Sequence, residues 1–313
     1  MNVLKIAGLK VTFTMPGGNI HALDSIDLSI QSGESCAIVG ESGCGKSVLG
    51  MAVMRLLPPN AIIGGNIRYR GSDLTSLDES TMRKIRGNEI AMTPQNSVMS
   101  LNPVMKIGRQ VIEPLILHQE ISPHVAKRSA INLLQSLGIH DPGKVMSQYP
   151  HELSGGMRER ILIAMSLICN PELLIADEPT AGLDILIRNQ TIDLFKRQLF
   201  KKTLFLITHD LDCADMLCSR IIVMYAGEIV ESGPTKEVLS SPRHPYTLGL
   251  LASLPSAGLH PIRGISPSPA QIPQGCRFYD RCHASSDTCS HDHPSLKVIN
   301  NLRQVRCHCY DRT

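Results

Sequence analysis

One stretch of eight residues constrains the fold of this chain more than any other. Residues 40–47 match the pattern G-x-x-x-x-G-K-[ST] of phosphate-binding loops, reading Gly40-Glu41-Ser42-Gly43-Cys44-Gly45-Lys46-Ser47. An apolar run over residues 35–39 predicts a buried strand before this phosphate loop, and helical spacing predicts a helix over residues 47–57 after it. Strand, glycine loop and helix in this order indicate an α/β fold, and the alternative is a glycine-rich turn with a chance lysine.

The residue types in the phosphate loop suit a nucleoside triphosphate. Glycines let backbone N–H groups turn inward around an anion, and the N-terminus of the following helix adds partial positive charge. We expect Lys46 to reach the β- and γ-phosphates of ATP and the Ser47 hydroxyl to bind Mg²⁺.

Composition limits the classes of protein that the chain can belong to. Its 313 residues allow one large domain, or one domain with an appendage, and 42% hydrophobic residues can form a substantial core. A net charge of +3 with no long basic run does not indicate a nucleic-acid partner. No apolar stretch reaches 18 residues and the N-terminus lacks a signal pattern, so we expect a cytoplasmic protein without a membrane span.

Apolar runs separated by helical patterns predict a mainly parallel sheet. Hairpins are expected within residues 1–35 and 221–230, and buried strands are expected over residues 172–176 and 203–207. Helical patterns cover residues 81–87 and 123–138. From residue 241 the composition shifts to Pro, Ser, His and Cys, which predicts a boundary there.

A second polar centre ends one of the buried strands. Asp177 and Glu178 follow the run Leu173-Leu174-Ile175-Ala176, at the edge of a sheet where α/β folds bind nucleotides. Asp177 would hold Mg²⁺ through water, and Glu178 would polarise the attacking water as general base. A solvated Asp-Glu pair at a helix start is the alternative.

A third motif, Leu153-Ser154-Gly155-Gly156-Met157, precedes an apolar helix over residues 161–169. It has the composition of a second anion-binding helix start. One chain that already holds its phosphates does not need this second site, unless the motif caps the γ-phosphate bound to a neighbouring molecule. The alternative is an N-cap serine followed by two flexible glycines.

The order of these motifs resembles that of ABC-type ATPases. The resemblance adds Gln95 as a sensor of Mg²⁺ and the γ-phosphate, Asp184 at the contact between two ATPase chains, and His209 beside the γ-phosphate and catalytic water. The ordinary alternatives are a turn residue for Gln95 and a capping residue for His209. Phe13 is either an aromatic platform for adenine or a residue of a strand core.

Residues 95–110 and 244–251 resemble the ATPases of oligopeptide, dipeptide and nickel importers. This resemblance implies an ABC nucleotide-binding domain over residues 1–240, with a parallel sheet core, an antiparallel β subdomain and a helical subdomain over about residues 97–165. Residues 241–313 would form a small Cys-rich C-terminal extension, here called the tail.

The resemblance also implies partners and a location. The chain would pair with a second related ATPase as a heterodimer, with a homodimer still open, and would couple to two transmembrane permease subunits. An extracytoplasmic binding protein would deliver peptide, nickel, another metal chelate or certain sugars to this importer, and the sequence does not identify the cargo. The chain would lie peripherally on the cytoplasmic face of a bacterial or archaeal inner or plasma membrane. No nucleic acid is expected.

The tail concentrates cysteine in the spacing C-x5-C-x6-C-x17-C. Four thiolates suit a [4Fe–4S] cluster or tetrahedral zinc equally on chemical grounds, and a metal-free reduced loop is the alternative. The resemblance implies a structural iron–sulfur cluster on Cys276, Cys282, Cys289 and Cys307.

Two other classes of function fit part of the sequence. A soluble ABC ATPase of DNA repair or translation usually carries tandem units, coiled-coil insertions or basic linkers, and the sequence has none of these. A metal-sensing module centred on the tail would not need Lys46, Glu178 and His209, which are all present. The sequence therefore favours an ATP-hydrolysing subunit of a membrane importer.

Overall fold

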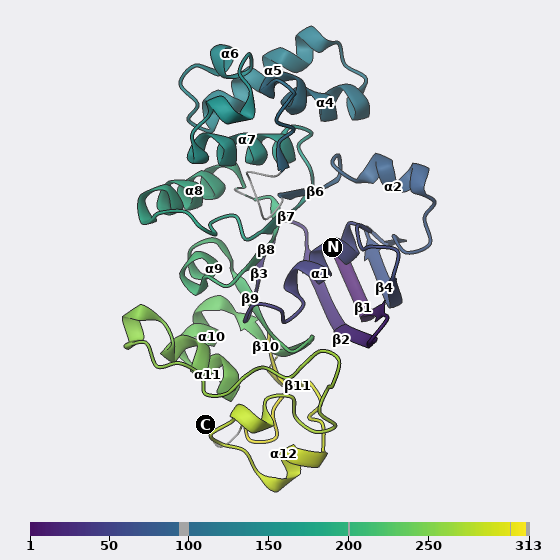
Figure 1. The fold of residues 1–313 in the computed structure, drawn as a ribbon, viewed down its shortest axis with the longest axis vertical. Helices are drawn as coiled ribbons and strands as arrows, with labels where there is room; N and C mark the ends of the chain where they lie inside the picture. The colour runs from purple at the N-terminus through teal and green to yellow at the C-terminus, as the bar shows by residue number, and fades with distance from the viewer. Residues whose placement is uncertain (94–99, 200, 301, 311–313) are drawn as a thin grey trace. The chain divides into compact units, whose positions relative to one another are not determined.

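The structure is a computed structural model, which describes residues 1–93, 100–199, 201–300 and 302–310 (Figure 1). The chain divides into two compact units. The first unit joins Met1–Thr75 to Ile207–Thr313, and the second is Ser76–Leu206. The tail therefore belongs to the same unit as the phosphate loop.

An antiparallel sheet begins the first unit. Its strand order is β2-β1-β4-β5, with the bounds β1 Asn2–Met15, β2 Gly18–Gln31, β4 Ala61–Tyr69 and β5 Ser72–Asp73. The turn between Met15 and Gly18 closes the β1–β2 hairpin, as the sequence predicts. Leu4, Leu9 and Val11 of β1 are fully buried, because one face of this sheet packs against the core.

A second group of strands in the first unit carries the phosphate loop. β3 (Ser35–Val39) pairs in parallel with β9 (Arg220–Tyr225), and β9 forms the predicted hairpin with β10 (Glu228–Pro234). The tail continues this sheet, because β12 (Arg303–Val305) pairs with β10 and β11 (Lys297–Asn300) pairs with β12. The strands that the tail supplies to this sheet are not predicted from the sequence.

Short helices complete the first unit: α1 Lys46–Val53, α9 Leu211–Leu217, α10 Thr235–Ser240, α11 Pro245–Ala252 and α12 Asp287–His291, with 3-10 turns at Pro255–Ala257 and Tyr279–Arg281. Helix α1 ends earlier than residue 57, where the sequence places its end. Arg55 takes a left-handed conformation with φ +52°. Its guanidinium donates to the Leu74 carbonyl at 3.2 Å, which turns the chain toward β4 before the proline is reached.

The second unit is mainly helical. Its helices are α2 Glu79–Ile85, α4 Ile107–Gln119, α5 Pro123–Ser136, α6 Pro142–Val145, α7 Gly155–Leu167 and α8 Ile185–Gln198, with a 3-10 turn at Pro150–Glu152. Helices α4 and α5 contact each other and α7, and α6 contacts α5 (Figure 1). Ser122 caps the start of α5 through the Val125 N–H, and Gly138 follows its end at φ +77°.

Parallel strands in the second unit position the Asp-Glu pair. β6 (Ile90–Thr93) pairs in parallel with β7 (Leu173–Asp177), and every residue of β7 is buried. Strand β8 (Thr203–Thr208) lies across the division between the units and is equally buried. Parallel strands, an antiparallel sheet and a helical region confirm the predicted α/β class. None of the described helices is long and apolar enough to cross a membrane.

Candidate nucleotide site

The phosphate loop joins β3 to α1 and is tightly seated at two glycines. A Cβ on Gly45, at φ +105°, would lie 2.6 Å from the Ala22 carbonyl oxygen. A Cβ on Gly40, at φ +154°, would lie 2.2 Å from the Met224 carbonyl oxygen. A Cβ on Gly43 would meet nothing within 4 Å. The loop is therefore packed against the unit at both ends, while its middle borders open space.

Lys46 holds its ammonium group over this loop. The side chain is buried, and Nζ donates to the Gly40 carbonyl at 2.7 Å and the Glu41 carbonyl at 3.0 Å. No side chain caps the N-terminus of α1, where an anion would find backbone N–H groups. Ser47 follows as the second residue of α1. The cationic group, the helix start and the open middle of the loop fit a bound polyphosphate.

The second unit carries the acidic pair at the carboxyl end of β7. Asp177 is 3% exposed and Glu178 is 8% exposed. Glu178 has φ +50°, a conformation that residues other than glycine adopt rarely and mostly at functional sites. The strand end thus presents two carboxyl groups in the order that the sequence predicts.

The Ser-Gly-Gly motif starts α7 in the second unit. Ser154 is the N-cap, and its hydroxyl accepts from the Met157 N–H at 3.3 Å. Ser154, Gly156 and Met157 line a cavity of about 520 Å³ together with Ile187 of α8. The motif is therefore both a capped helix start, as its ordinary interpretation has it, and the wall of a hollow.

The remaining predicted residues lie on both units. Asp184 caps α8 through the Ile187 N–H at 2.9 Å, and the neighbouring Ile185 and Leu186 are highly exposed. His209 is exposed directly after β8, and Phe13 is half-buried on β1 between its partners Ile20 and Ala61. Gln95 lies outside the described residues.

A group of tail residues that the sequence does not reveal contacts the phosphate loop. Arg281, Ser266 and Tyr246 all bond to Glu41, the second residue of the loop. The signal in the sequence was slight: Arg277 and Arg281 lie between the first two tail cysteines. Their partners are far away in the chain, so spacing alone does not reveal them.

Four of the five tail cysteines gather in a small packed core. Cys289, Cys307 and Cys309 are buried with Val305, and Cys276 packs against them. Burial raises the pKa of the Cys276 thiol to about 12 and that of Cys307 to about 11. Among the described residues, no group of three or more His, Cys, Asp or Glu side chains could hold a metal ion. The structure therefore gives no support to zinc or an iron–sulfur cluster on Cys276, Cys282, Cys289 and Cys307.

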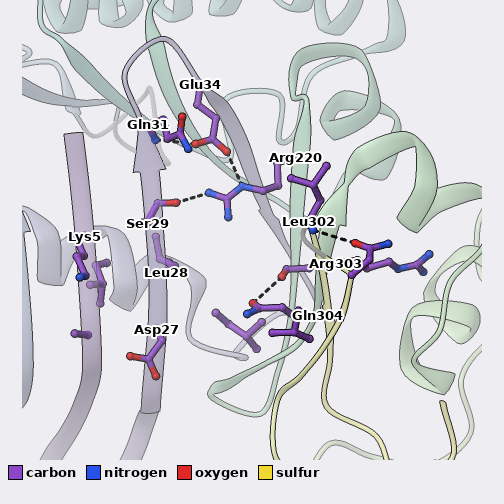
Figure 2. Close-up of a pocket in the computed structure, with 16 residues that line it drawn as sticks. Lys5, Asp27, Leu28, Ser29, Gln31, Glu34, Arg220, Leu302, Arg303 and Gln304 are labelled. Atoms are coloured by element: carbon purple, nitrogen blue, oxygen red, sulfur yellow. Dashed lines mark hydrogen bonds and ion pairs between the residues drawn. The ribbon is translucent and has the colours of Figure 1, made fainter. Parts of the chain in front are cut away.

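Another hollow in the first unit, of about 470 Å³, lies between β2 and the β11–β12 hairpin (Figure 2). Figure 2 shows the guanidinium of Arg220 bonded to the Glu34 carboxylate and the Ser29 carbonyl. The Arg220–Glu34 ion pair measures 2.6 Å. This pairing ties β9 to the end of β2, so we assign these groups to the fold and not to a ligand.

Taken together, the motifs define a nucleotide-binding α/β protein with a phosphate loop, an acidic strand end and a Ser-Gly-Gly helix start in one chain. The chain belongs to the ABC transporter family, whose model matches residues 23–181. A second model, the oligopeptide/dipeptide transporter C-terminal region, matches residues 230–289. Like the family, the chain is an ATPase.

Similar proteins cover nearly the whole chain. The oligopeptide transport ATP-binding protein AppD of Bacillus subtilis is 42% identical over 318 residues, covering 99% of this chain and 97% of the relative. The dipeptide transport ATP-binding protein DppD of the same organism is 42% identical, covering 99% and 95%. A dimeric structure of the ATP-binding cassette MJ0796 with ADP and Pi matches at a TM-score of 0.67 and 28% identity, covering 74% of this chain and 98% of that one.

Proposed function

We propose that this chain is the ATP-hydrolysing motor subunit of a membrane importer for peptides. Its similarity to oligopeptide and dipeptide transport ATP-binding proteins carries this proposal, because it extends through the tail as well as the nucleotide-binding region. Nickel was an open alternative from the sequence, and none of the relatives described above is named for it.

The predicted site residues have complementary roles in hydrolysis. Lys46 binds the β- and γ-phosphates, while Ser47, Asp177 and Gln95 hold Mg²⁺, directly or through water. Glu178 accepts the proton of the attacking water, and His209 contacts the γ-phosphate and that water. Mg²⁺, when bound, neutralises charge on the phosphate oxygens. Burial of Lys46 and Glu178 supports these roles, since electrostatic effects are stronger away from water.

Two ATPase chains form each complete site. Ser154 and its neighbouring glycines bind the γ-phosphate held by the phosphate loop of the partner, and Asp184 lies at the contact between the chains. The exposed Ile185 and Leu186 support an interface beside Asp184. ATP closes the dimer because both chains contact the γ-phosphate, and hydrolysis removes that contact. The partner is a second related ATPase, with a second copy of this chain as the alternative.

Coupling to transport requires further subunits. Two transmembrane permeases receive the motion of the ATPase dimer near Gln95. Phe13 has a separate role and contacts the adenine ring of ATP. A separate extracytoplasmic protein delivers the peptide. The ATPase chain itself acts peripherally at the cytoplasmic face of the membrane. The ATPase chain does not touch the cargo in this arrangement.

For the tail, we propose that Cys276, Cys282, Cys289 and Cys307 bind a structural [4Fe–4S] cluster. A [4Fe–4S] cluster binds each thiolate to a different iron, so its ligands need not converge on one point as they do around zinc. The likeness of the tail to the C-terminal region of oligopeptide and dipeptide transporters carries this part of the proposal, since the described residues themselves form no metal-holding group. Iron and acid-labile sulfide, measured on chain purified without oxygen, test this: four irons per chain are expected for that cluster, and none would refute it.

Peptide uptake tests the proposed function. Cells that carry Glu178→Gln in place of the wild-type chain should lose uptake of labelled dipeptide or oligopeptide while keeping uptake of labelled nickel. Glu237→Gln changes an exposed carboxylate in α10 and is the matched control. Unchanged peptide uptake in the Glu178→Gln cells would refute the proposal.

A further inference from the structure

Arg281 of the tail reaches the phosphate loop and binds Glu41, the only acidic residue of that loop. The guanidinium of Arg281 forms two parallel hydrogen bonds with the Glu41 carboxylate, at 2.8 and 2.9 Å. The Arg281 side chain is only 6% exposed. A bidentate arginine–carboxylate pair fixes both position and orientation, which a single ionic contact does not.

Two other tail residues fix the same part of the loop. The Ser266 hydroxyl donates to a Glu41 carboxylate oxygen at 2.6 Å, and the Glu41 N–H donates to the Tyr246 hydroxyl at 2.8 Å. The Glu41 carbonyl in turn accepts from Lys46 at 3.0 Å. The N–H, carbonyl and carboxylate of one loop residue are therefore all bound, the first and last of them by the tail.

Arg281 is itself anchored by the core of the first unit. Its guanidinium lies over the rings of Tyr225 and Phe278, at 5.7 and 5.8 Å, and its Nε donates to the Arg263 carbonyl at 3.0 Å. Tyr225 ends β9, the strand that pairs with β3. The rings of Tyr225 and Tyr246 lie 4.6 Å apart, so the groups that hold Glu41 form one rigid cluster.

The charge of Glu41 explains why such a hold is needed. A carboxylate in a loop that receives a polyphosphate repels the ligand unless a cation neutralises it. Burial acts to raise the pKa of Glu41, but hydrogen bonds from Arg281 and Ser266 outweigh it and hold that pKa below its usual value. Glu41 therefore stays ionised, and Arg281 supplies the compensating charge.

The tail also forms a wall beside the open middle of the loop. A cavity of about 220 Å³ is lined by Ser42, Gly43 and Cys44 on one side and by the tail segment from Ser266 to Pro269 on another. The Pro269 carbonyl accepts from the His21 N–H of β2 at 2.9 Å, which fastens this segment in place.

We propose that Arg281 is a positioning residue of the nucleotide site, through which the folded tail keeps the phosphate loop in its ATP-binding conformation. The inference rests on the phosphate-binding role proposed for this loop. Without Arg281 the loop samples other conformations, and the apparent affinity for ATP falls in proportion to the competent fraction. Once ATP is bound, the phosphates themselves hold the loop, so kcat changes little.

Arg277 offers a matched control within the same tail segment. Its side chain is 3% exposed and also ties the tail to the unit, through an ion pair with Asp24 at 2.5 Å and a bond to the Ala226 carbonyl. No hydrogen bond or ion pair described for Arg277 goes to residues 40–47. A loss of tail docking alone would affect both arginine variants alike.

The test compares Arg281→Gln, Arg277→Gln and wild type in the full chain, by ATP titration, by thermal unfolding, and by kcat and KM for hydrolysis with the partner ATPase present. We expect Arg281→Gln to raise Kd and KM for ATP about tenfold with kcat within about twofold, as for a loop that is competent in one molecule in ten. Arg277→Gln should lower the unfolding temperature without changing Kd. Equal effects of both variants on Kd, or no effect of Arg281→Gln, would overturn the inference.

Two further variants keep the result interpretable. Arg281→Lys retains the charge without the bidentate geometry and should recover part of the ATP affinity even if Arg281→Gln folds poorly. Adding Glu41→Gln to Arg281→Gln removes the uncompensated carboxylate, so the double variant should bind ATP more tightly than Arg281→Gln alone. The opposite order would refute the charge argument. Absence of ATP binding by wild type would instead refute the phosphate-binding role itself.

Discussion

The buried His244 makes the stability of the first unit depend on pH. Its side chain is 2% exposed, and Nδ1 accepts from the Tyr246 N–H at 3.0 Å as the N-cap of α11. Burial lowers the pKa of this imidazole to about 3, opposed by a hydrogen bond with the Arg306 backbone and reinforced by the Arg306 charge. A proton on Nδ1 would replace the acceptor of the cap by a donor.

The direction of the pH effect follows from proton binding in the two states. Unfolded His244 takes up a proton near its ordinary pKa of 6.5, whereas the folded chain takes it up only near 3. Between pH 6.5 and 3 the unfolded state binds more protons than the folded state. The contribution of neutral His244 to the free energy of unfolding is therefore fully present above pH 6.5 and is lost as the pH falls toward 3. Between pH 7 and 5 the loss from this one group is about 2 kcal/mol.

Urea unfolding at pH 7, 6 and 5, followed by circular dichroism, measures this loss. His244→Asn keeps a capping side chain that does not titrate, and should flatten the pH dependence by about 2 kcal/mol over this interval. His124→Asn, an exposed position in α5, should leave the dependence as in wild type. If His244→Asn loses stability with falling pH as steeply as wild type does, His244 is not the group that causes the loss.

Three other predictions concern the nucleotide site. Gly45→Ala should lose ATP binding and about 2–4 kcal/mol of stability in thermal and urea unfolding, because its Cβ would clash with the Ala22 carbonyl. Gly43→Ala is the control: its Cβ has open space, so it should lose only the roughly 1–2 kcal/mol that a left-handed alanine costs. Glu178→Gln should accumulate with its partner ATPase as an ATP-dependent dimer in size-exclusion chromatography, since the γ-phosphate that both chains contact is not hydrolysed. A monomer in ATP, with the partner ATPase present, would contradict this. Ser154→Arg should abolish that dimer while leaving the affinity of the chain for ATP within about twofold. The reason is that Ser154 contacts the γ-phosphate of the ATP bound to the other chain, not of the ATP bound to its own.

Local sequence was enough to predict the elements that short-range physics decides. The glycines and lysine of the phosphate loop have to follow a strand and start a helix, and α1 begins at Lys46 as that pattern requires. The Met15–Gly18 turn closes a hairpin whose strands are adjacent in sequence. The run that ends at Asp177 is a buried strand because every residue in it but the last is apolar.

The tail could not be predicted in the same way, because its contacts join distant parts of the chain. Strand β12 has only three residues, and pairing with β10 decides its place. Arg303 forms a buried ion pair at 2.6 Å with Glu231, which lies 72 residues away. Arg281 and Glu41 are 240 residues apart. No periodicity or spacing in the sequence indicates such pairs, so the hold of the tail on the loop emerged only from the structure.

The general-base role of Glu178 can be tested by MgATP hydrolysis with wild type, Glu178→Gln and Glu237→Gln chains, each with its partner ATPase. We expect Glu178→Gln to lower kcat by about 10²–10⁴-fold while the Kd for ATP stays within about threefold, and Glu237→Gln to behave as wild type. Hydrolysis by Glu178→Gln at the wild-type rate would show that the carboxylate at the end of β7 is not the general base.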